Sequence, residues 1–333
     1  MKTMLTIALI ACGCAAGAQP PEAIPLWPHG APGESPLAQA EADTSGPSGA
    51  LVAGRSVIRL GNVSTPTLSV YSPPAGKNTG AAVLVFPGGG YSILALDLEG
   101  SEICEWLNTI GVTGVLVKYR VPAQQNSARK GAPLEDAQRA ISMVRHDAAK
   151  WHIDPARIGI VGFSAGGHLA ANLSTHFEKR SYEAVDDADT VSLRPDFAML
   201  VYPAYLVGRD GALAPELTVT ASTPPAFLIQ AENDGVGVEN SLGYFAALRK
   251  NRVPAEMHIY AEGGHGYGLR PTDLPITGWP ALAEKWLRHI GMLGQGPAAG
   301  EGKSPAPLRS RLRIGFRAAT VRDRKGAVGV VIS

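Results

Sequence analysis

The sequence has few cysteines and no excess of charge of either sign. Only three of its 333 residues are cysteines, and 30 Lys and Arg residues face 29 Asp and Glu residues, for a formal net charge of +1. A protein that binds nucleic acid would need a basic face, so the charge balance argues against that class of partner. The hydrophobic fraction of 45% is ordinary for a globular chain with an ample core.

Long hydrophobic runs are also missing. After the first twenty residues, no segment of the sequence is long and apolar enough to span a bilayer. The first eighteen residues differ from the rest and are predicted to be a signal peptide. Lys2 supplies the charged start, Met4–Ala11 the apolar segment, and Ala16–Ala18 (Ala-Gly-Ala) a cleavage site before Gln19. We therefore expect a secreted or periplasmic protein with no integral membrane segment in its mature chain.

A second interpretation of the leader concerns Cys12. The stretch Leu9–Cys12 (Leu-Ile-Ala-Cys) is similar to a bacterial lipobox, which would leave a lipidated Cys12 at the mature terminus. We prefer ordinary cleavage after Ala18. That cleavage leaves Cys104 alone, so no disulfide can form within the mature chain.

Residues 19–293 are predicted to form one domain. Its first part, to about residue 56, is rich in Pro, Gly, Ala and Ser and is expected to be an irregular wrapping segment. Strand-like and helix-like segments then alternate, which predicts an α/β fold with a mostly parallel, doubly wound sheet and helices on both faces. The expected strands are 57–60 and 67–71 (antiparallel leading strands), 81–86, 114–118, 157–161, 197–201, 226–230 and 257–260, and the expected helices are 99–110, 134–151, 167–173, 242–248 and 280–290.

Residues 294–333 have a different character, with Pro305, Pro307 and a run of basic residues between Arg309 and Lys325. We interpret this segment as a disordered or cloning-derived tail outside the fold. A basic arm that binds an anionic surface is the alternative hypothesis.

The most informative motif is Gly162–Gly166 (Gly-Phe-Ser-Ala-Gly). An apolar, β-branched segment precedes it and an Ala- and Leu-rich helical segment follows, which is the context of a nucleophile elbow. The turn is so sharp that only very small residues fit at its two glycines, and it exposes the Ser164 hydroxyl at the C-terminal edge of the sheet. The N–H of Ala165 opens the following helix and is expected to face a developing oxyanion.

A serine nucleophile needs a histidine base, and that histidine needs an acid that fixes its tautomer. His265 lies in a glycine-rich loop, Gly263–Gly268, soon after the strand that ends at Tyr260, where ligands of open α/β sheets bind. The other seven histidines lie in helical patterns, within a strand or in the N-terminal segment. We therefore assign His265 as the base.

The acid is expected between the serine and the histidine in chain order. Asp234 follows the strand 226–230 and is our assignment. Its neighbour Glu232 is the main rival, and Asp210 lies in the loop after the preceding strand.

A second set of oxyanion donors is expected from Pro87–Tyr91 (Pro-Gly-Gly-Gly-Tyr), after the strand 81–86. Consecutive glycines let the backbone approach a substrate carbonyl, so the N–H groups of Gly88 and Gly89 are assigned to the oxyanion hole with that of Ala165. A plain tight turn is the alternative. No Gly-Lys-Ser/Thr follows, which argues against a phosphate-binding loop.

Together these segments resemble the α/β-hydrolase superfamily, and within it the esterases related to hormone-sensitive lipase. They are most similar to the secreted acetyl xylan esterase and feruloyl esterase-like group, over about residues 81–290. The resemblance implies a serine esterase without cofactor or metal, of a kind often found with polysaccharide-degrading enzymes. One position departs from the pattern: Pro87 replaces the usual histidine, so a hydrogen bond that supports the glycine loop in many relatives is missing.

The sequence thus predicts a secreted ester hydrolase that acts through an acyl-enzyme on small esters or on acetylated polysaccharide such as xylan. The short, turn-rich connection from Tyr202 to Pro225 leaves no room for a large helical cap, which favours short acyl groups. A feruloyl esterase, a lipase or a peptidase of the same fold are alternatives. A non-catalytic carbohydrate-binding protein is the alternative from another class, although it would be expected to lose one of the three catalytic residues. The sequence does not predict the oligomeric state.

Overall fold

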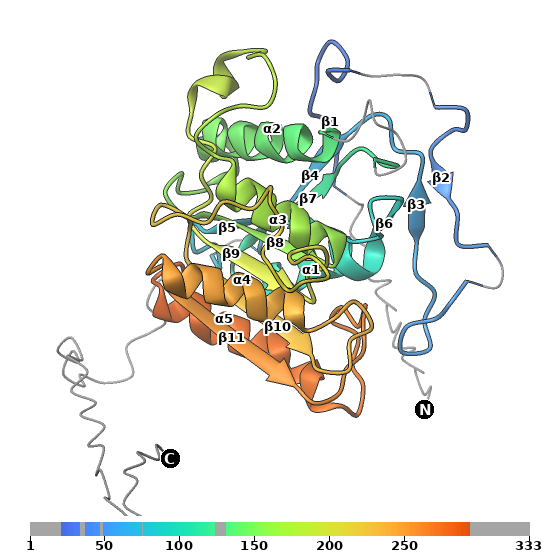
Figure 1. The fold of residues 1–333 in the computed structure, drawn as a ribbon. Coiled ribbons are helices and arrows are strands. Elements are labelled where there is room, and N and C mark those ends of the chain that lie inside the picture. The colour runs from blue at the N-terminus through green and yellow to red at the C-terminus, as the bar shows by residue number, and fades with distance from the viewer. Residues whose placement is uncertain (1–20, 34–36, 47–48, 75, 124–130, 294–333) are drawn as a thin grey trace, which may run out of the picture. The chain divides into compact units, whose positions relative to one another are not determined.

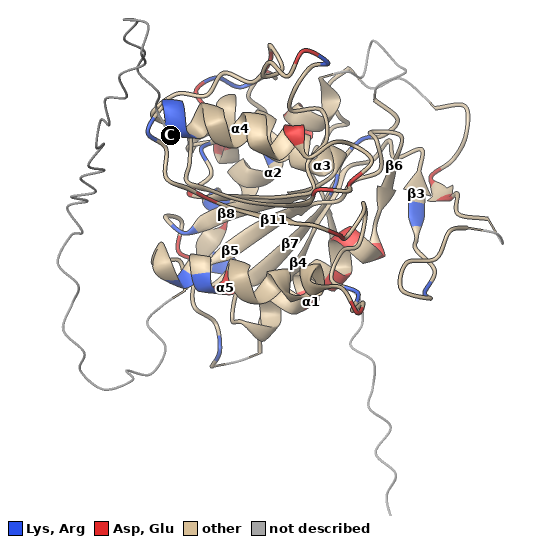
Figure 2. Cartoon of the chain, turned by 60° about the horizontal axis from the view of Figure 1, so that its bottom comes forward, with Lys and Arg blue, Asp and Glu red and all other residues tan. Residues whose placement is uncertain are grey.

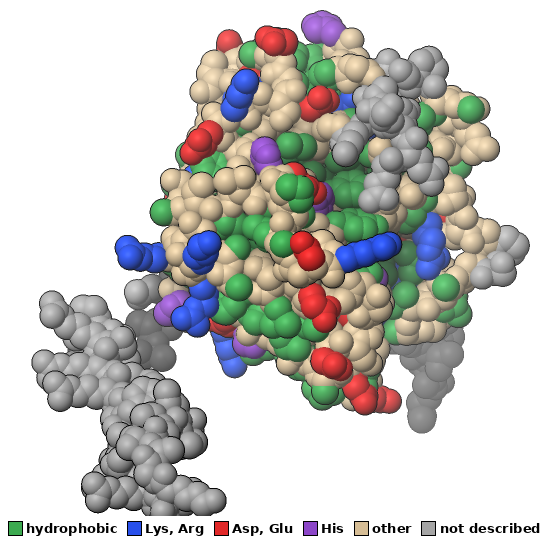
Figure 3. All heavy atoms as spheres, in the orientation of Figure 1, with side chains coloured by type: hydrophobic (Ala, Val, Ile, Leu, Met, Phe, Trp, Pro, Cys, Tyr) green, Lys and Arg blue, Asp and Glu red, His purple; other side chains and the backbone are tan. Residues whose placement is uncertain are grey.

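The computed structural model describes residues 21–33, 37–46, 49–74, 76–123 and 131–293. The predicted signal peptide (1–18) and the basic tail (294–333) lie outside the described residues, so both stay predictions. Within the described ranges, no helix has the length and apolar character needed to cross a bilayer. Acidic and basic side chains are interspersed over the face drawn in Figure 3.

An eight-stranded sheet forms the centre of the domain, in the order β1-β4-β7-β5-β8-β9-β10-β11. The strands β1 and β4 are antiparallel to their neighbours, and all other pairs are parallel. This confirms the predicted mostly parallel sheet. The bounds are β1 (Ala23–Pro25), β4 (Thr67–Tyr71), β7 (Thr113–Lys118), β5 (Ala82–Phe86), β8 (Ile158–Phe163), β9 (Ala198–Val201), β10 (Ala226–Ala231) and β11 (Ala255–Tyr260).

Helices cover both faces of the sheet, which Figure 2 shows from its edge. One layer holds α2 (Ala132–His146), α3 (Ala165–Thr175) and α4 (Glu239–Lys250), and the other holds α1 (Glu102–Thr109) and α5 (Trp279–His289). Leu84 of β5 packs in the core cluster of the first layer and Val85 in that of the second. Burial on both faces explains why the central strands are apolar without alternation. Short turns of other helical types are η1 (Asp97–Ser101), η3 (Ala148–Trp151), η4 (Asp187–Thr190) and η5 (Pro275–Gly278).

Two features of the N-terminal part differ from expectation. The segment expected to be irregular contains β1 and β2, which at three and two residues are too short to show periodicity. The expected leading strand 57–60 is wrong for the main sheet, because β3 (Arg59–Gly61) pairs with β2 (Ala42–Asp43) and β6 (Ile93–Ala95) in a separate three-stranded sheet. The strands β2 and β3 lie to one side of the main sheet (Figure 1).

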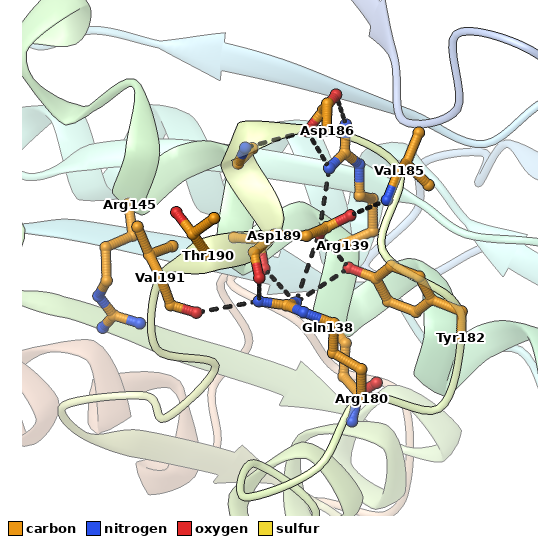
Figure 4. Close-up of polar contacts among 12 residues, drawn as sticks. Gln138, Arg139, Arg145, Arg180, Tyr182, Val185, Asp186, Asp189, Thr190 and Val191 are labelled. Carbon is orange, nitrogen blue, oxygen red and sulfur yellow. Dashed lines mark hydrogen bonds and ion pairs between the residues drawn. The ribbon is translucent and has the colours of Figure 1, made fainter.

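A polar cluster holds the segment between α3 and β9 against α2 (Figure 4). Arg139 of α2 pairs with Asp186 and Asp189, and Arg180 also pairs with Asp189. The buried Asp189 carboxylate accepts hydrogen bonds from the Tyr182 hydroxyl at 2.6 Å and the Val185 N–H at 2.8 Å. Because its charges and hydrogen bonds are matched, the cluster acts as an anchor for the chain that leads into β9.

Candidate active site

The link between β8 and α3 is a turn that needs its glycines. A Cβ atom at Gly162 would lie 2.0 Å from the Gly166 carbonyl oxygen, and one at Gly166 would lie 2.1 Å from that of Phe86. Ser164 itself has φ +52° and ψ −118°, a conformation that non-glycine residues rarely adopt. The crowded glycines therefore hold Ser164 in the strained turn that the motif predicts.

The structure brings Ser164, His265 and Asp234 together. Ser164 Oγ lies 2.8 Å from His265 Nε2, and His265 Nδ1 lies 2.9 Å from Asp234 Oδ2. The three residues follow the C-terminal ends of β8, β11 and β10, which parallel strands place at one edge of the sheet. The imidazole is 30% exposed and the Asp234 carboxylate is inaccessible, so the hydrogen-bonded chain runs from solvent into the protein.

The surroundings of Asp234 fix its orientation. Its Oδ1 accepts from the Val236 N–H at 2.9 Å, and its Oδ2 also accepts from Gln230 Nε2 at 3.1 Å. An ionised carboxylate can only accept hydrogen bonds, so the ring nitrogen that contacts Asp234, Nδ1 of His265, is assigned the proton. The lone pair of Nε2 then faces Ser164. This is the protonation state that a general base requires.

The other acids considered from the sequence lie elsewhere. The Glu232 side chain is exposed. Asp210 accepts from the Ala212 N–H at 3.1 Å within its own loop. Of these three acids, Asp234 is the one in contact with the imidazole.

The expectation for Gly88 needs correction. Its N–H donates to Glu99 Oε2 at 2.7 Å, so it is not directed to a substrate. The N–H groups of Gly89, Gly90 and Ala165 make no hydrogen bond within the described residues. The backbone donors left for an oxyanion among the described residues are therefore those of Gly89, Gly90 and Ala165, and the assignment of Gly89 and Ala165 to an oxyanion hole stays a prediction.

Glu99, in η1, also contributes to the site, although nothing in the sequence marked it. The residue is buried, with 3% of its surface exposed. Besides the Gly88 N–H it accepts from the Tyr202 hydroxyl at 2.9 Å, and that hydroxyl accepts from the Gly268 N–H at 3.1 Å. Burial raises the pKa of Glu99, and these two donors and the charge of His265 oppose the rise. Glu99 thus connects the glycine loop with the loop that carries His265. Acidic residues are common at the start of a helix, so the position of Glu99 in the sequence did not indicate that its side chain is buried.

Other contacts support the glycine loop where Pro87 stands in place of histidine. The Tyr119 hydroxyl donates to the Pro87 carbonyl at 2.5 Å. The Ala95 N–H of β6 donates to the Gly88 carbonyl at 2.9 Å. The loop is therefore fixed from two sides.

We expect Glu99→Gln to lower kcat by about 10- to 100-fold, less than the roughly 10²- to 10³-fold loss of an oxyanion donor itself. The carboxylate of Glu99 accepts one hydrogen bond on each oxygen, from the Gly88 N–H and from the Tyr202 hydroxyl. A glutamine has only one acceptor oxygen, so one of these hydrogen bonds is lost and the glycine loop is held less firmly. The measurement is kcat per active site, titrated by the burst of first product. Glu105→Gln, on the exposed face of α1, is the matched control. A purely structural role would lower Tm and the titrated fraction while leaving kcat per site within twofold, and that result would contradict the assignment.

The described part of the chain holds no group of three or more His, Cys, Asp or Glu side chains placed to bind a metal ion. What the site offers is a hydroxyl, a base, an oriented acid and unpaired backbone donors. These are the groups that acyl transfer through a serine nucleophile requires.

Comparisons with known proteins point the same way. A family model called BD-FAE matches residues 68–197. The crystal structure of the acetyl ester-xyloside bifunctional hydrolase from Caldicellulosiruptor lactoaceticus is 36% identical, covers 83% of this chain and 98% of its own, and gives a TM-score of 0.66. MGS-M1, an α/β hydrolase from a Medee basin deep-sea metagenome library, is 27% identical over 71% of this chain and 97% of its own, with a TM-score of 0.56.

Among curated proteins, the acetylxylan esterase of Xylanibacter ruminicola is 29% identical over 273 residues, which is 74% of this chain and 51% of that protein. The chain therefore spans about half the length of this curated relative. Together with the solved structures, this similarity confirms the predicted α/β-hydrolase fold.

Proposed function

This chain belongs to the BD-FAE family of α/β hydrolases, and on that premise we propose that it is a serine carboxylic-ester hydrolase. The observation that carries the proposal is the continuous chain of hydrogen bonds from Ser164 Oγ through His265 to Asp234. The N–H groups of Gly89 and of Ala165, which follows Ser164 in the chain, have no hydrogen-bond partner among the described residues.

The proposed reaction has two halves. Ser164 Oγ attacks the ester carbonyl while His265 Nε2 takes its proton, and the oxyanion forms against the N–H groups of Gly89, Gly90 and Ala165. His265 then gives the proton to the departing alkoxide, leaving an acyl-enzyme. Water repeats the sequence and releases the carboxylic acid. Asp234 stays ionised and holds the imidazole in position.

The proposed substrate is an acetyl or other short acyl ester of a xylan-type sugar. The acetylxylan esterase and the acetyl ester-xyloside hydrolase to which the chain is similar support this choice. We also propose that the protein acts outside the cytoplasm, on the basis of the predicted leader at residues 1–18.

Ester chain length tests the substrate class. Residues 202–225, which the structure describes throughout, contain no helix that could form an apolar cap. A buried methylene contributes roughly 0.8 kcal/mol only where apolar side chains enclose it, and this connection supplies no such cover over the site. We therefore expect kcat/KM on p-nitrophenyl esters to be highest for acetate and to fall steeply beyond about four carbons. A maximum at octanoate would identify a lipase instead.

A further inference from the structure

A cavity of about 540 Å³ lies next to the glycine loop and is not used by the reaction described above. Its volume is that of a site for a small molecule. Among the described residues, its lining includes Tyr91, His168, Asn172, Tyr205 and Glu216, together with apolar side chains.

The cavity is close to the nucleophile. His168 follows Ser164 on α3 by one turn, which is about 6 Å along the helix axis. Tyr91 comes directly after the glycine loop, and a Cβ atom at Gly90 would lie 3.7 Å from the Tyr205 hydroxyl oxygen. The cavity therefore borders both the first turn of α3, which follows Ser164, and the end of the glycine loop.

Two tyrosines form an aromatic wall. The rings of Tyr91 and Tyr205 are stacked, with centroids 6.4 Å apart and planes at 22°. Tyr91 is buried, whereas Tyr205 is 45% exposed and has φ +60°. A large exposed ring held in an uncommon backbone conformation is a feature of ligand-binding sites.

Polar side chains form another part of the wall. His168 Nδ1 lies 2.8 Å from the Tyr91 hydroxyl and Nε2 lies 3.2 Å from Glu216 Oε1. Burial lowers the pKa of His168, and Glu216 opposes this. These contacts fit a neutral imidazole that accepts from Tyr91 and donates to Glu216, which orients the carboxylate at the rim. The Asn172 amide lies one turn further along α3, with its Nδ2 3.5 Å from His168 Nδ1.

We propose that this cavity binds the pyranose ring of an acylated sugar. The inference rests on the proposed function and names the part of the substrate that the cavity receives. A pyranose has an apolar C–H face, suited to the Tyr205 ring, and a rim of hydroxyls, suited to the Asn172 amide and the Glu216 carboxylate. An alkyl chain would instead remove water from these polar groups. It offers no hydrogen bonds in place of those that the groups make with water, so its binding would cost free energy.

The experiment compares two substrates with the same acyl group, acetylated xylo-oligosaccharides and p-nitrophenyl acetate. For each variant, the readout is the ratio of kcat/KM on the sugar ester to kcat/KM on the p-nitrophenyl ester. We expect Tyr205→Ala to lower this ratio roughly tenfold, mainly through KM on the sugar ester, because the aromatic face is lost. Tyr205→Phe keeps the ring and should keep the ratio within about twofold.

Asn172→Ala is the second test variant and is expected to lower the ratio several-fold. Leu242→Ala, at an exposed position on α4, is the control for an unrelated substitution. Xylobiose should also inhibit wild-type hydrolysis of p-nitrophenyl acetate competitively, and more weakly in Tyr205→Ala, which tests the site without a sugar ester.

The outcomes separate the two proposals. No hydrolysis of either ester by the wild type would overturn the proposed function. Hydrolysis of both esters, with ratios unchanged in Tyr205→Ala and Asn172→Ala and no inhibition by xylobiose, would overturn the sugar site alone. A shift in the preference for p-nitrophenyl butyrate over acetate, without a change in the sugar ratio, would assign the cavity to the acyl group and also overturn it.

Discussion

Ser164→Ala is expected to lower kcat on p-nitrophenyl acetate by roughly 10⁵-fold or more while leaving the fold intact. The hydroxyl is the atom that attacks, and residues that act as one catalytic unit lose nearly the whole rate enhancement when one is removed. Alanine retains the Cβ atom, so the elbow at φ +52° is no more strained than before. The measurement is steady-state kcat with matched circular dichroism.

Ser174→Ala provides the control on the same helix. Its Oγ is buried and has no hydrogen-bond partner among the described residues, so its removal should leave kcat near the wild-type value. Activity of Ser164→Ala within about tenfold of wild type would show that another residue is the nucleophile.

Asp234→Asn is expected to lower kcat by roughly 10⁴-fold, because an amide in this position favours the wrong imidazole tautomer. In the variant, an amide oxygen at the Oδ1 position keeps the hydrogen bond from the Val236 N–H and gives up the one from Gln230 Nε2, and the NH₂ group then faces His265 Nδ1. Nδ1 must then accept, so the ring proton moves to Nε2 and faces Ser164. The base can no longer take the serine proton.

Glu232→Gln is the matched comparison, because it makes the same change of carboxylate to amide two residues away on an exposed side chain. We expect its kcat to stay within a few-fold of wild type. A larger loss for Glu232→Gln than for Asp234→Asn would assign the acid to Glu232.

The sequence predicted the elements that depend on local patterns. The order of strands and helices followed from runs of apolar residues, and the sharp turn at Ser164 followed from two glycines whose Cβ atoms would collide with backbone. The loops of Asp234 and His265 could be placed because parallel strands end at one edge of the sheet. These signals lie within a few residues of each feature.

Features that depend on tertiary contact were not predicted. The Gly88 N–H is taken by Glu99, a residue from the next element, and no local pattern marks that carboxylate as buried. The aromatic wall joins Tyr91 to Tyr205, which come from separate loops. The short β1 and the pairing of β3 with β6 likewise depend on which segments meet in space.

The most direct test of the account is the reaction of the protein with diethyl p-nitrophenyl phosphate, which phosphorylates serines activated as nucleophiles. We predict one label per chain, on the peptide that contains Ser164, with loss of esterase activity in proportion to labelling. The Ser164→Ala variant should not be labelled. The Asp234→Asn variant should be labelled much more slowly than the wild type. Stoichiometric labelling of another serine, or full esterase activity after Ser164 is labelled, would contradict the central claim.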